Sequence, residues 1–392
     1  MANSSSAINT LFFIILLLLW SCTLHVRGCY TSIISFGDSL TDTGNLKQLT
    51  SGLNQKPLNF FLPPYGETFF HEPTGRCSNG RLIIDFIAES LNLSYVRPFY
   101  DGNDSQMMGL GQGVNYAVVG ATALDSSFFE ARGIHNPTTN TSLGYQVEWF
   151  KQWLPSICAN VSDCSLVLAR SLILVGEIGG NDYNHALVAG KSIDEVEAYV
   201  PFVVEAIISA INELIELGVE TLLVPGNLPI GCLAEYLTMY NGVDKMEYDN
   251  LTGCLTQLNK FTEYHNELLV TKLNKIRHLH PGANIIYADY YNAAMQFFRS
   301  PNKYGFTNGA LKACCGGGGA FYYNDSIACG DPSSTVCAQP DTYANWDGLH
   351  LTESAYKVIS KSLLQGPFTV PRFKSFCPST ILKEIDRLSS YM

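Results

Sequence analysis

Basic residues are scarce in this chain of 392 residues, which has 24 Lys and Arg against 35 Asp and Glu. The formal net charge is −11, and no basic stretch stands out. A protein that binds phosphate backbones needs a basic face, so the charge balance argues against nucleic acid as a partner. No internal repeat or low-complexity segment stands out either, which argues against a repeat architecture.

Long hydrophobic runs are also rare, and only residues 11–20, LFFIILLLLW, form one. About ten residues are too few to cross a bilayer, which takes roughly 20, but they suit the apolar core of a signal peptide. We therefore expect residues 1–28 to be a signal peptide cleaved between Thr23 and Gly28, with an N-terminal core helix as the alternative. Because no second run follows and the C-terminal tail is polar, we expect no stable membrane insertion.

Zinc-binding patterns are absent, because no C-x-x-C pair has a matching second pair or histidine set. His278 and His280 indicate a metal only weakly, and we expect neither a metal nor a cofactor. The 12 cysteines are nevertheless many for a cytosolic enzyme and cluster as disulfides do. We expect bonds between Cys158 and Cys164 and within the second pair, Cys232 and Cys254. The pairing of the other local cluster stays open: Cys314, Cys315, Cys329 and Cys337.

Six N-x-[ST] sequons follow the expected signal peptide, and chance would supply some of them. They are candidate glycosylation sites at Asn92, Asn103, Asn140, Asn160, Asn250 and Asn324. Together with the signal peptide and the cysteines they predict a secreted glycoprotein.

Five short apolar runs predict buried parallel strands, at residues 32–36, 114–119, 171–176, 221–225 and 284–288. Helical patterns lie between or after them, at residues 82–91, 146–154, 195–217, 255–280 and from Thr352 onward. Strands that alternate with helices predict a three-layer α/β/α fold with a mainly parallel five-stranded sheet. We expect one domain over residues 29–392.

Two segments without this alternation, residues 45–80 and 304–343, are candidate walls of a substrate pocket. Both contain aromatic side chains that could line such a pocket or simply cover the core: Tyr65, Phe69, Phe70, Tyr322 and Tyr323.

The G-x-S-x-G turn of α/β-hydrolase lipases is missing, because Thr41 stands where its second glycine would be. A different serine is well placed: Ser39 follows the first predicted strand, at the sheet edge where open α/β folds do chemistry. A serine nucleophile needs a base, and the base needs an orienting group. Asp347 and His350, three residues apart, supply a carboxylate and an imidazole far downstream.

Four blocks in order resemble the GDSL, or SGNH, hydrolase superfamily and, within it, the plant GDSL esterase/lipase family. They are FGDSLTDTGN at 36–45, GVNYAVVGATALD at 113–125, GEIGGNDYN at 176–184 and DGLHLTESAY at 347–356. The resemblance extends from about Cys29 to the last helix and implies a flavodoxin-like SGNH hydrolase fold. It also implies that Ser39 is the nucleophile, His350 the general base and Asp347 its carboxylate partner.

The resemblance further implies an oxyanion hole made of the backbone N–H groups of Ser39 and Gly120 and the side-chain amide of Asn181. Such donors must point in advance to where charge develops. Many relatives have a second glycine where this chain has Val119, which should stiffen or narrow that wall slightly. His185, near the third block, is an alternative base that lacks an aspartate at the D-x-x-H spacing.

Asp38 and Asp42 flank the candidate nucleophile, and we expect both carboxylates to support the turn rather than to transfer protons.

These residues predict a secreted serine esterase that hydrolyses acyl or acetyl esters of small plant metabolites or lipids through an acyl-enzyme. By resemblance it would act in the cell wall or apoplast, with the vacuole as the alternative, and we expect a monomer. Two rivals remain: an acyltransferase with the same triad, and a catalytically silent secreted binding or defence protein.

Overall fold

The computed structural model describes residues 29–53, 56–101, 113–158, 160–243, 247–378 and 382–385. The expected signal peptide and the sequon at Asn103 lie outside these residues. Of the other sequons, Asn92, Asn140, Asn160 and Asn250 are exposed and Asn324 is partly buried.

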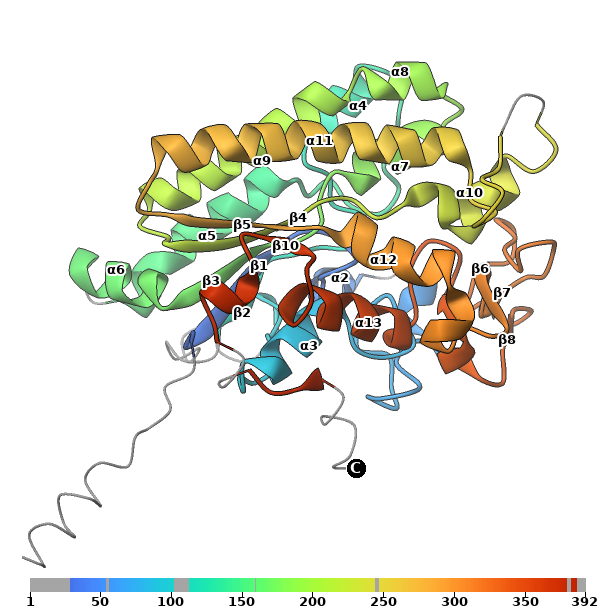
Figure 1. Ribbon diagram of the computed structural model, residues 1–392, viewed down its shortest axis with the longest axis horizontal. Coiled ribbons are helices and arrows are strands. Elements are labelled where there is room, and N and C mark those ends of the chain that lie inside the picture. Colours follow the sequence, from blue (N-terminus) through green and yellow to red (C-terminus); the bar gives the residue numbers. More distant parts are fainter. Residues whose placement is uncertain are drawn as a thin grey trace, which may run out of the picture.

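A six-stranded sheet in the order β10-β5-β4-β3-β1-β2 runs through the middle of the molecule (Figure 1). Its strands are β1 (Ser32–Phe36), β2 (Val114–Asn115), β3 (Ser171–Val175), β4 (Thr221–Pro225), β5 (Asn284–Ala288) and β10 (Thr369–Val370). The first five are parallel, whereas β10 pairs antiparallel with β5. The expected α/β fold with a mainly parallel sheet is confirmed. Two differences are the added two-residue edge strand β10 and the shortening of the expected strand at 114–119.

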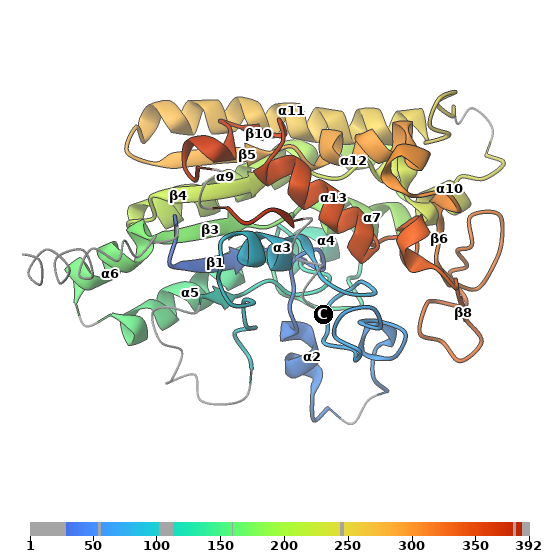
Figure 2. The ribbon, with the colours of Figure 1, turned by 60° about the horizontal axis from the view of Figure 1, so that its bottom comes forward.

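Helices cover both faces of the sheet (Figures 1 and 2). One face carries α5 (Leu143–Ile157), α9 (Val200–Glu216) and α11 (Thr256–Leu279), and the other carries α3 (Ile83–Ser90), α12 (Tyr290–Arg299) and α13 (Glu353–Leu364). In α9 the buried side chains recur at helical spacing, as in Val200, Val203, Ile207, Ile211 and Leu214. This apolar stripe faces the core.

Shorter elements fill the connections between these layers. The helices are α2 (Asn45–Thr50), α4 (Ser126–Glu130), α6 (Val161–Ala169), α7 (Gly180–Val188), α8 (Ile193–Glu197) and α10 (Ala234–Met239). The strands are β6 (Gly309–Ala313), β7 (Cys315–Gly316), β8 (Thr335–Val336) and β9 (Tyr343–Asn345). Single 3-10 turns lie at Asn59–Phe61, Ile230–Cys232, Pro301–Tyr304, Pro340–Thr342 and Phe373–Ser375.

Among the described residues, one stretch, Ile193–Glu216, is long and apolar enough to cross a membrane by length and composition alone. It comprises α8 and α9, so the single helix expected over residues 195–217 is in fact two. Half of its most apolar window is buried inside the molecule. Packing of α9 against α5 and α11 accounts for this apolar composition.

Five disulfides join ten cysteines of the described chain. Both expected pairs, Cys158–Cys164 and Cys232–Cys254, are confirmed. The local cluster pairs as Cys314–Cys337 and Cys315–Cys329, and a further bond joins Cys29 to Cys377. Cys77 is buried and is the one free thiol among the described residues.

The order of the parallel strands places a crevice between the ends of β1 and β3, where successive connections leave in opposite directions. The two loops touch there, since Asp38 N–H donates to the carbonyl of Glu177 (3.2 Å) and Gly176 N–H to that of Phe36 (2.7 Å). A Cβ at Gly176 would lie 2.3 Å from the Phe36 carbonyl, so only glycine permits this approach.

Gln146 fixes the beginning of the β1 loop from helix α5. Its side-chain oxygen accepts from the N–H of Gly37 (2.8 Å), and its amide nitrogen donates to the carbonyl of the same residue (2.8 Å). Gln146 is fully buried, so these bonds satisfy both backbone groups of Gly37 away from water.

Gln146→Leu should lower the free energy of unfolding by about 1–3 kcal/mol, because the buried N–H of Gly37 loses its partner, whereas the Gly37 carbonyl keeps the N–H of Val118 (3.1 Å). Gln152→Leu, on the exposed side of the same helix, is the matched control and should change it little. Urea denaturation measures both. Equal effects of the two substitutions would show that the Gly37 bonds do not stabilise the loop.

Candidate active site

The turn after β1 is organised by the buried carboxylate of Asp42. It accepts four backbone hydrogen bonds, from Gly44 (2.7 Å), Asn45 (2.6 Å), Leu46 (3.1 Å) and Val119 (2.9 Å). Burial raises the pKa of Asp42 to about 6, and these donors oppose the rise. The carboxylate thus supports the turn, as expected, and ties it to the segment after β2.

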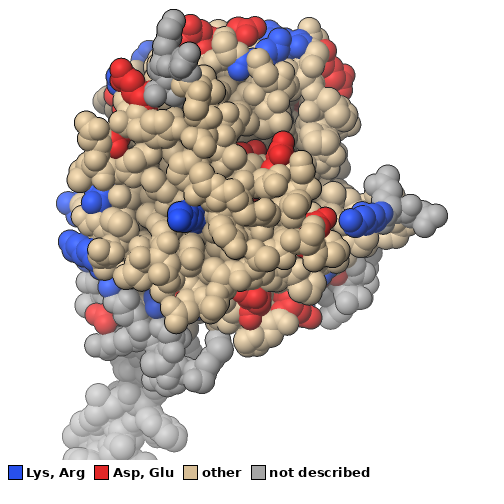
Figure 3. Space-filling model, turned by 90° about the vertical axis from the view of Figure 1, so that its right-hand side faces the viewer, with Lys and Arg blue, Asp and Glu red and all other residues tan. Residues whose placement is uncertain are grey.

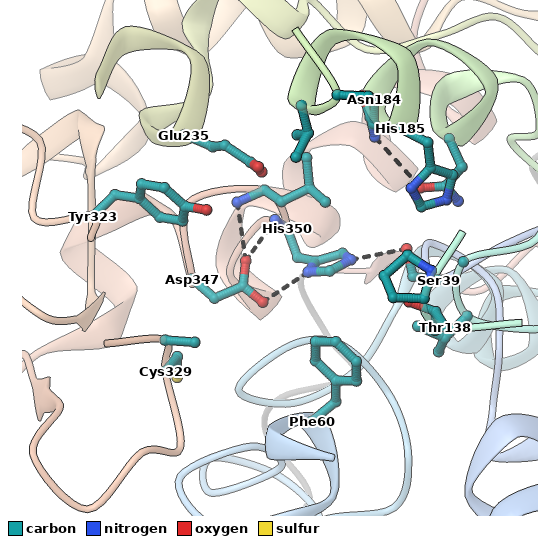
Figure 4. Close-up of a pocket in the computed structure, with 18 of the residues that line it drawn as sticks. Ser39, Phe60, Thr138, Asn184, His185, Glu235, Tyr323, Cys329, Asp347 and His350 are labelled. Carbon is teal, nitrogen blue, oxygen red and sulfur yellow. Dashed lines mark hydrogen bonds and ion pairs between the residues drawn. The ribbon is translucent and has the colours of Figure 1, made fainter. Parts of the chain in front are cut away.

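Ser39, His350 and Asp347 form one hydrogen-bonded chain (Figure 4). His350 Nε2 lies 2.8 Å from Ser39 Oγ, and His350 Nδ1 lies 2.7 Å from Asp347 Oδ2. Ser39 and His350 are 5% and 4% exposed, so the chain is largely shielded from water. The structure therefore brings together the three residues that the sequence placed in one site.

The loop carrying Asp347 and His350 is folded around the carboxylate. Asp347 Oδ1 accepts from the backbone N–H groups of Leu349 (3.0 Å) and His350 (2.8 Å). Trp346 continues the support: its N–H donates to the His350 carbonyl (2.8 Å), and its carbonyl accepts from Cys315 (2.7 Å). The segment around Cys315, which is disulfide-bonded to Cys329, therefore holds this loop in place.

Tyr65 adds a contact that the sequence did not indicate. Its hydroxyl donates to Asp347 Oδ2 (2.8 Å), the oxygen that also faces the imidazole. Tyr65 was expected only as a possible pocket wall, and its position 282 residues from Asp347 left no local signal for this bond.

The contact between Asp347 and His350 shifts the pKa of both side chains. Burial alone would raise the pKa of Asp347, but the His350 charge and hydrogen bonds hold it below its usual range. Burial alone would lower the pKa of His350, but the Asp347 carboxylate raises it above the ordinary value. The imidazole is thus a stronger base than a free histidine.

Two residues that line the catalytic pocket, Ser39 and Gly120, have backbone N–H groups without a described acceptor. Among the described hydrogen bonds, neither the N–H of Ser39 nor that of Gly120 has a partner. Gly120 has φ +81°, and a Cβ there would lie 2.7 Å from the Thr138 side chain. Among the described residues, neither N–H group is taken up by a protein acceptor.

The amide of Asn181, the third expected donor, is engaged. Its nitrogen donates to Asp38 Oδ2 (3.2 Å) and to the carbonyl of Ala121 (3.0 Å). Asn181 therefore lines the site, but a hydrogen bond to a substrate oxygen requires one of these bonds to loosen.

Beside this amide lies a buried pair of carboxyl groups, Asp38 and Glu177, of which Glu177 was not singled out in the sequence. Burial raises the pKa of Asp38 to about 6 and that of Glu177 well above its usual range, and the two side chains share a hydrogen bond. The bond and the proximity of Asp38 raise the pKa of Glu177 further. Asp38 therefore has two side-chain hydrogen-bond partners, Glu177 and Asn181.

These groups open into a pocket of about 520 Å³. Both expected wall segments contribute, Phe60 and Tyr65 from the first and Tyr323, Ala328 and Cys329 from the second. Phe69 and Phe70 instead stack on the guanidinium groups of Arg81 and Arg76, and Tyr322 is exposed outside the pocket lining. Of the two alternatives left open for these aromatic residues, lining of the pocket therefore applies to Tyr65 and Tyr323 and not to the other three.

His185, the alternative base, lies in the pocket wall near Asn184 rather than against Ser39. Burial lowers its pKa, while a hydrogen bond to the Gly120 backbone opposes the fall. Ser39 bonds to His350 instead. In the described ranges no group of three or more His, Cys, Asp or Glu side chains is arranged to hold a metal ion.

Comparison with known proteins identifies relatives along most of the chain. Residues 33–363 match the family model described as GDSL-like Lipase/Acylhydrolase. Curated Arabidopsis thaliana proteins, each named a GDSL esterase/lipase, are similar over nearly their whole length. One is 54% identical over 351 residues (90% of this chain, 86% of that protein), and another is 48% identical over 391 residues (99% and 98%).

A solved structure, phospholipase A1 from Streptomyces albidoflavus NA297, gives a far weaker match. It is 12% identical with a TM-score of 0.28, covering 68% of this chain and 82% of that one. At that TM-score the similarity supports no conclusion about the fold or function of this chain.

The His350 imidazole should titrate above the ordinary histidine pKa of about 6.5, because the Asp347 carboxylate favours its charged form. In Asp347→Asn the carboxylate is gone while burial remains, so the pKa of His350 should fall. NMR titration of the imidazole resonances measures both values. Asp341→Asn, at an exposed position, should leave the pKa unchanged. An equal pKa in wild type and Asp347→Asn would contradict the pairing.

Proposed function

Because the chain belongs to the GDSL-like lipase/acylhydrolase family and is a carboxylic ester hydrolase, we propose that it works through an acyl-enzyme formed on Ser39. Ser39 Oγ attacks the ester carbonyl while His350 Nε2 takes its proton. The tetrahedral intermediate collapses as His350 returns the proton to the leaving alcohol. Water, deprotonated by the same imidazole, then releases the acid and restores the serine.

The observation that carries this proposal is the bond between His350 Nε2 and Ser39 Oγ, backed by the bond between His350 Nδ1 and Asp347. Asp347 fixes the tautomer that leaves Nε2 free to accept a proton, and it stabilises the imidazolium. A secreted binding protein would need none of these bonds, so they favour catalysis over that rival.

The oxyanion hole is assigned to the N–H groups of Ser39 and Gly120 and to the amide of Asn181. Charge on the substrate oxygen would attract the Asn181 N–H that now donates to Asp38 at 3.2 Å, the longer of its two bonds. The hydrogen bond that Asp38 already shares with Glu177 would remain when this N–H turns away.

A secreted location in the cell wall, apoplast or vacuole is part of the same proposal. Five disulfides are typical of proteins that fold in an oxidising compartment. Exposed sequons, such as Asn92 and Asn140, are accessible to glycosylation. The pocket of about 520 Å³ suits esters of small plant metabolites or of lipids with a short acyl group.

Ser39→Ala should abolish ester hydrolysis and labelling by a fluorophosphonate probe while leaving the circular dichroism and the melting temperature unchanged. Ser51→Ala, at an exposed position after α2, should retain both activities. Hydrolysis of p-nitrophenyl esters and mass spectrometry of the labelled peptide are the measurements. Turnover that survives in Ser39→Ala would rule out this nucleophile.

Asn181→Ala should lower kcat by roughly 10²–10³, as the loss of one oxyanion donor does. Because the amide acts on the charged intermediate rather than on the bound ester, KM should change much less. A loss of kcat under threefold would remove Asn181 from the hole and leave the two backbone donors alone.

A further inference from the structure

Glu235 is a carboxyl group in the wall of the catalytic pocket, and no described Lys or Arg pairs with it. It lies near the beginning of α10 and is partly buried. Its side chain shares a hydrogen bond with the Tyr323 hydroxyl. No ion pair joins Glu235 to Lys or Arg among the described residues, and neither residue type lines the pocket. A carboxyl in a largely apolar wall costs stability unless something compensates it.

Glu235 and Tyr323 are held by the loop that carries the candidate base. The Glu235 N–H donates to the carbonyl of Gly348 (3.0 Å), between Asp347 and His350. Gly348 has φ +104°, and a Cβ there would lie 2.2 Å from the Tyr323 ring. The glycine therefore makes room for the tyrosine, and both polar side chains keep a fixed position relative to His350.

The position of Glu235 identifies the part of the substrate that it meets. In Figure 4, Glu235 and Tyr323 lie on one side of the His350 imidazole, and Ser39 and Thr138 lie on the other. The acyl carbon is bound to Ser39, and its oxygen faces the N–H groups of Ser39 and Gly120. The leaving alcohol receives its proton from His350 Nε2, and Glu235 and Tyr323 line the part of the same pocket beyond the imidazole, where we place the rest of the alcohol.

The electrostatics of this side favour a positive charge. Burial and then the nearby Asp347 raise the pKa of Glu235 to about 7, although the Tyr323 hydrogen bond and the His350 charge oppose the rise, so these two groups compensate its charge only in part. Figure 3 shows the corresponding face of the molecule, with acidic atoms inside a hollow and the visible basic atoms outside it. Phe60, whose ring lies 6.5 Å from that of His350, and Tyr323 add aromatic surfaces that attract cations.

We propose that Glu235, with Tyr323 and Phe60, forms a subsite for a cation on the leaving alcohol. The preferred substrates are then esters of amino alcohols or of alcohols with a quaternary nitrogen. This inference rests on the proposed acyl-enzyme mechanism, because it uses the direction in which the alcohol leaves. It assigns Glu235 a role in specificity and no role in proton transfer.

The test compares two esters of the same acid, one of choline and one of 3,3-dimethylbutanol. Their alcohols have the same shape and differ in one positive charge. The acid is the one preferred in a p-nitrophenyl ester series of graded chain length. At pH 8, where Glu235 is ionised, wild type should have a kcat/KM for the choline ester about tenfold higher than for the neutral ester.

Glu235→Gln should remove this preference by lowering kcat/KM for the choline ester, mainly through KM, while the neutral ester changes less than threefold. Asp325→Asn is the matched control: this exposed carboxylate also acts on Glu235 through space but lies outside the pocket lining. It should preserve most of the preference, so it separates a local contact from the general negative charge.

The outcomes separate a failure of the cation subsite from a failure of the acyl-enzyme mechanism on Ser39. If wild type hydrolyses the p-nitrophenyl and neutral esters but shows no preference for choline, or if Glu235→Gln lowers both esters equally, the cation subsite is wrong and the esterase stands. If Ser39→Ala retains the hydrolysis of all three classes of ester, the proposed mechanism fails first.

Discussion

The hydrogen bond between His350 Nε2 and Ser39 Oγ joins two residues that lie 311 positions apart, and most of the surrounding structure serves to hold it. On the serine side, Asp42 and Gln146 fix the backbone after β1. On the histidine side, Asp347 folds its own loop, and the segment of Cys315 supports that loop through Trp346. The bond forms because two independently rigid turns meet at one edge of the sheet.

This arrangement explains which parts of the protein the sequence could predict. The buried strands are short and apolar, so local composition marked all five parallel strands, and their alternation with helices indicated the layers. Each of the four motif blocks covers a loop and part of the adjoining strand or helix, and the residues that carry the chemistry lie close together in sequence within it. Ser39, Asp347 and His350 were therefore predictable, although only the fold could show that they touch.

The residues that sequence reasoning missed act across long separations. Tyr65 reaches Asp347 from 282 positions away, and Glu177 meets Asp38 only because β3 lies beside β1. Glu235 belongs to none of the motif blocks, and it is held at the site by the hydrogen bond from its N–H to the Gly348 carbonyl. Edge strand β10 was missed for another reason, since two residues, only one of them buried, carry no periodic signal. Such contacts depend on tertiary packing, which leaves no pattern in neighbouring residues.

The disulfide between Cys29 and Cys377 has a consequence for how the molecule matures. Its partners are 348 residues apart, so Cys29 must wait for almost the whole polypeptide before it can pair with Cys377. During translation Cys29 stays a thiol, while the pairs separated by 6 to 23 residues can already close. Closure of this ring therefore requires synthesis as far as Cys377, and a product that stops short of that residue cannot form the bond.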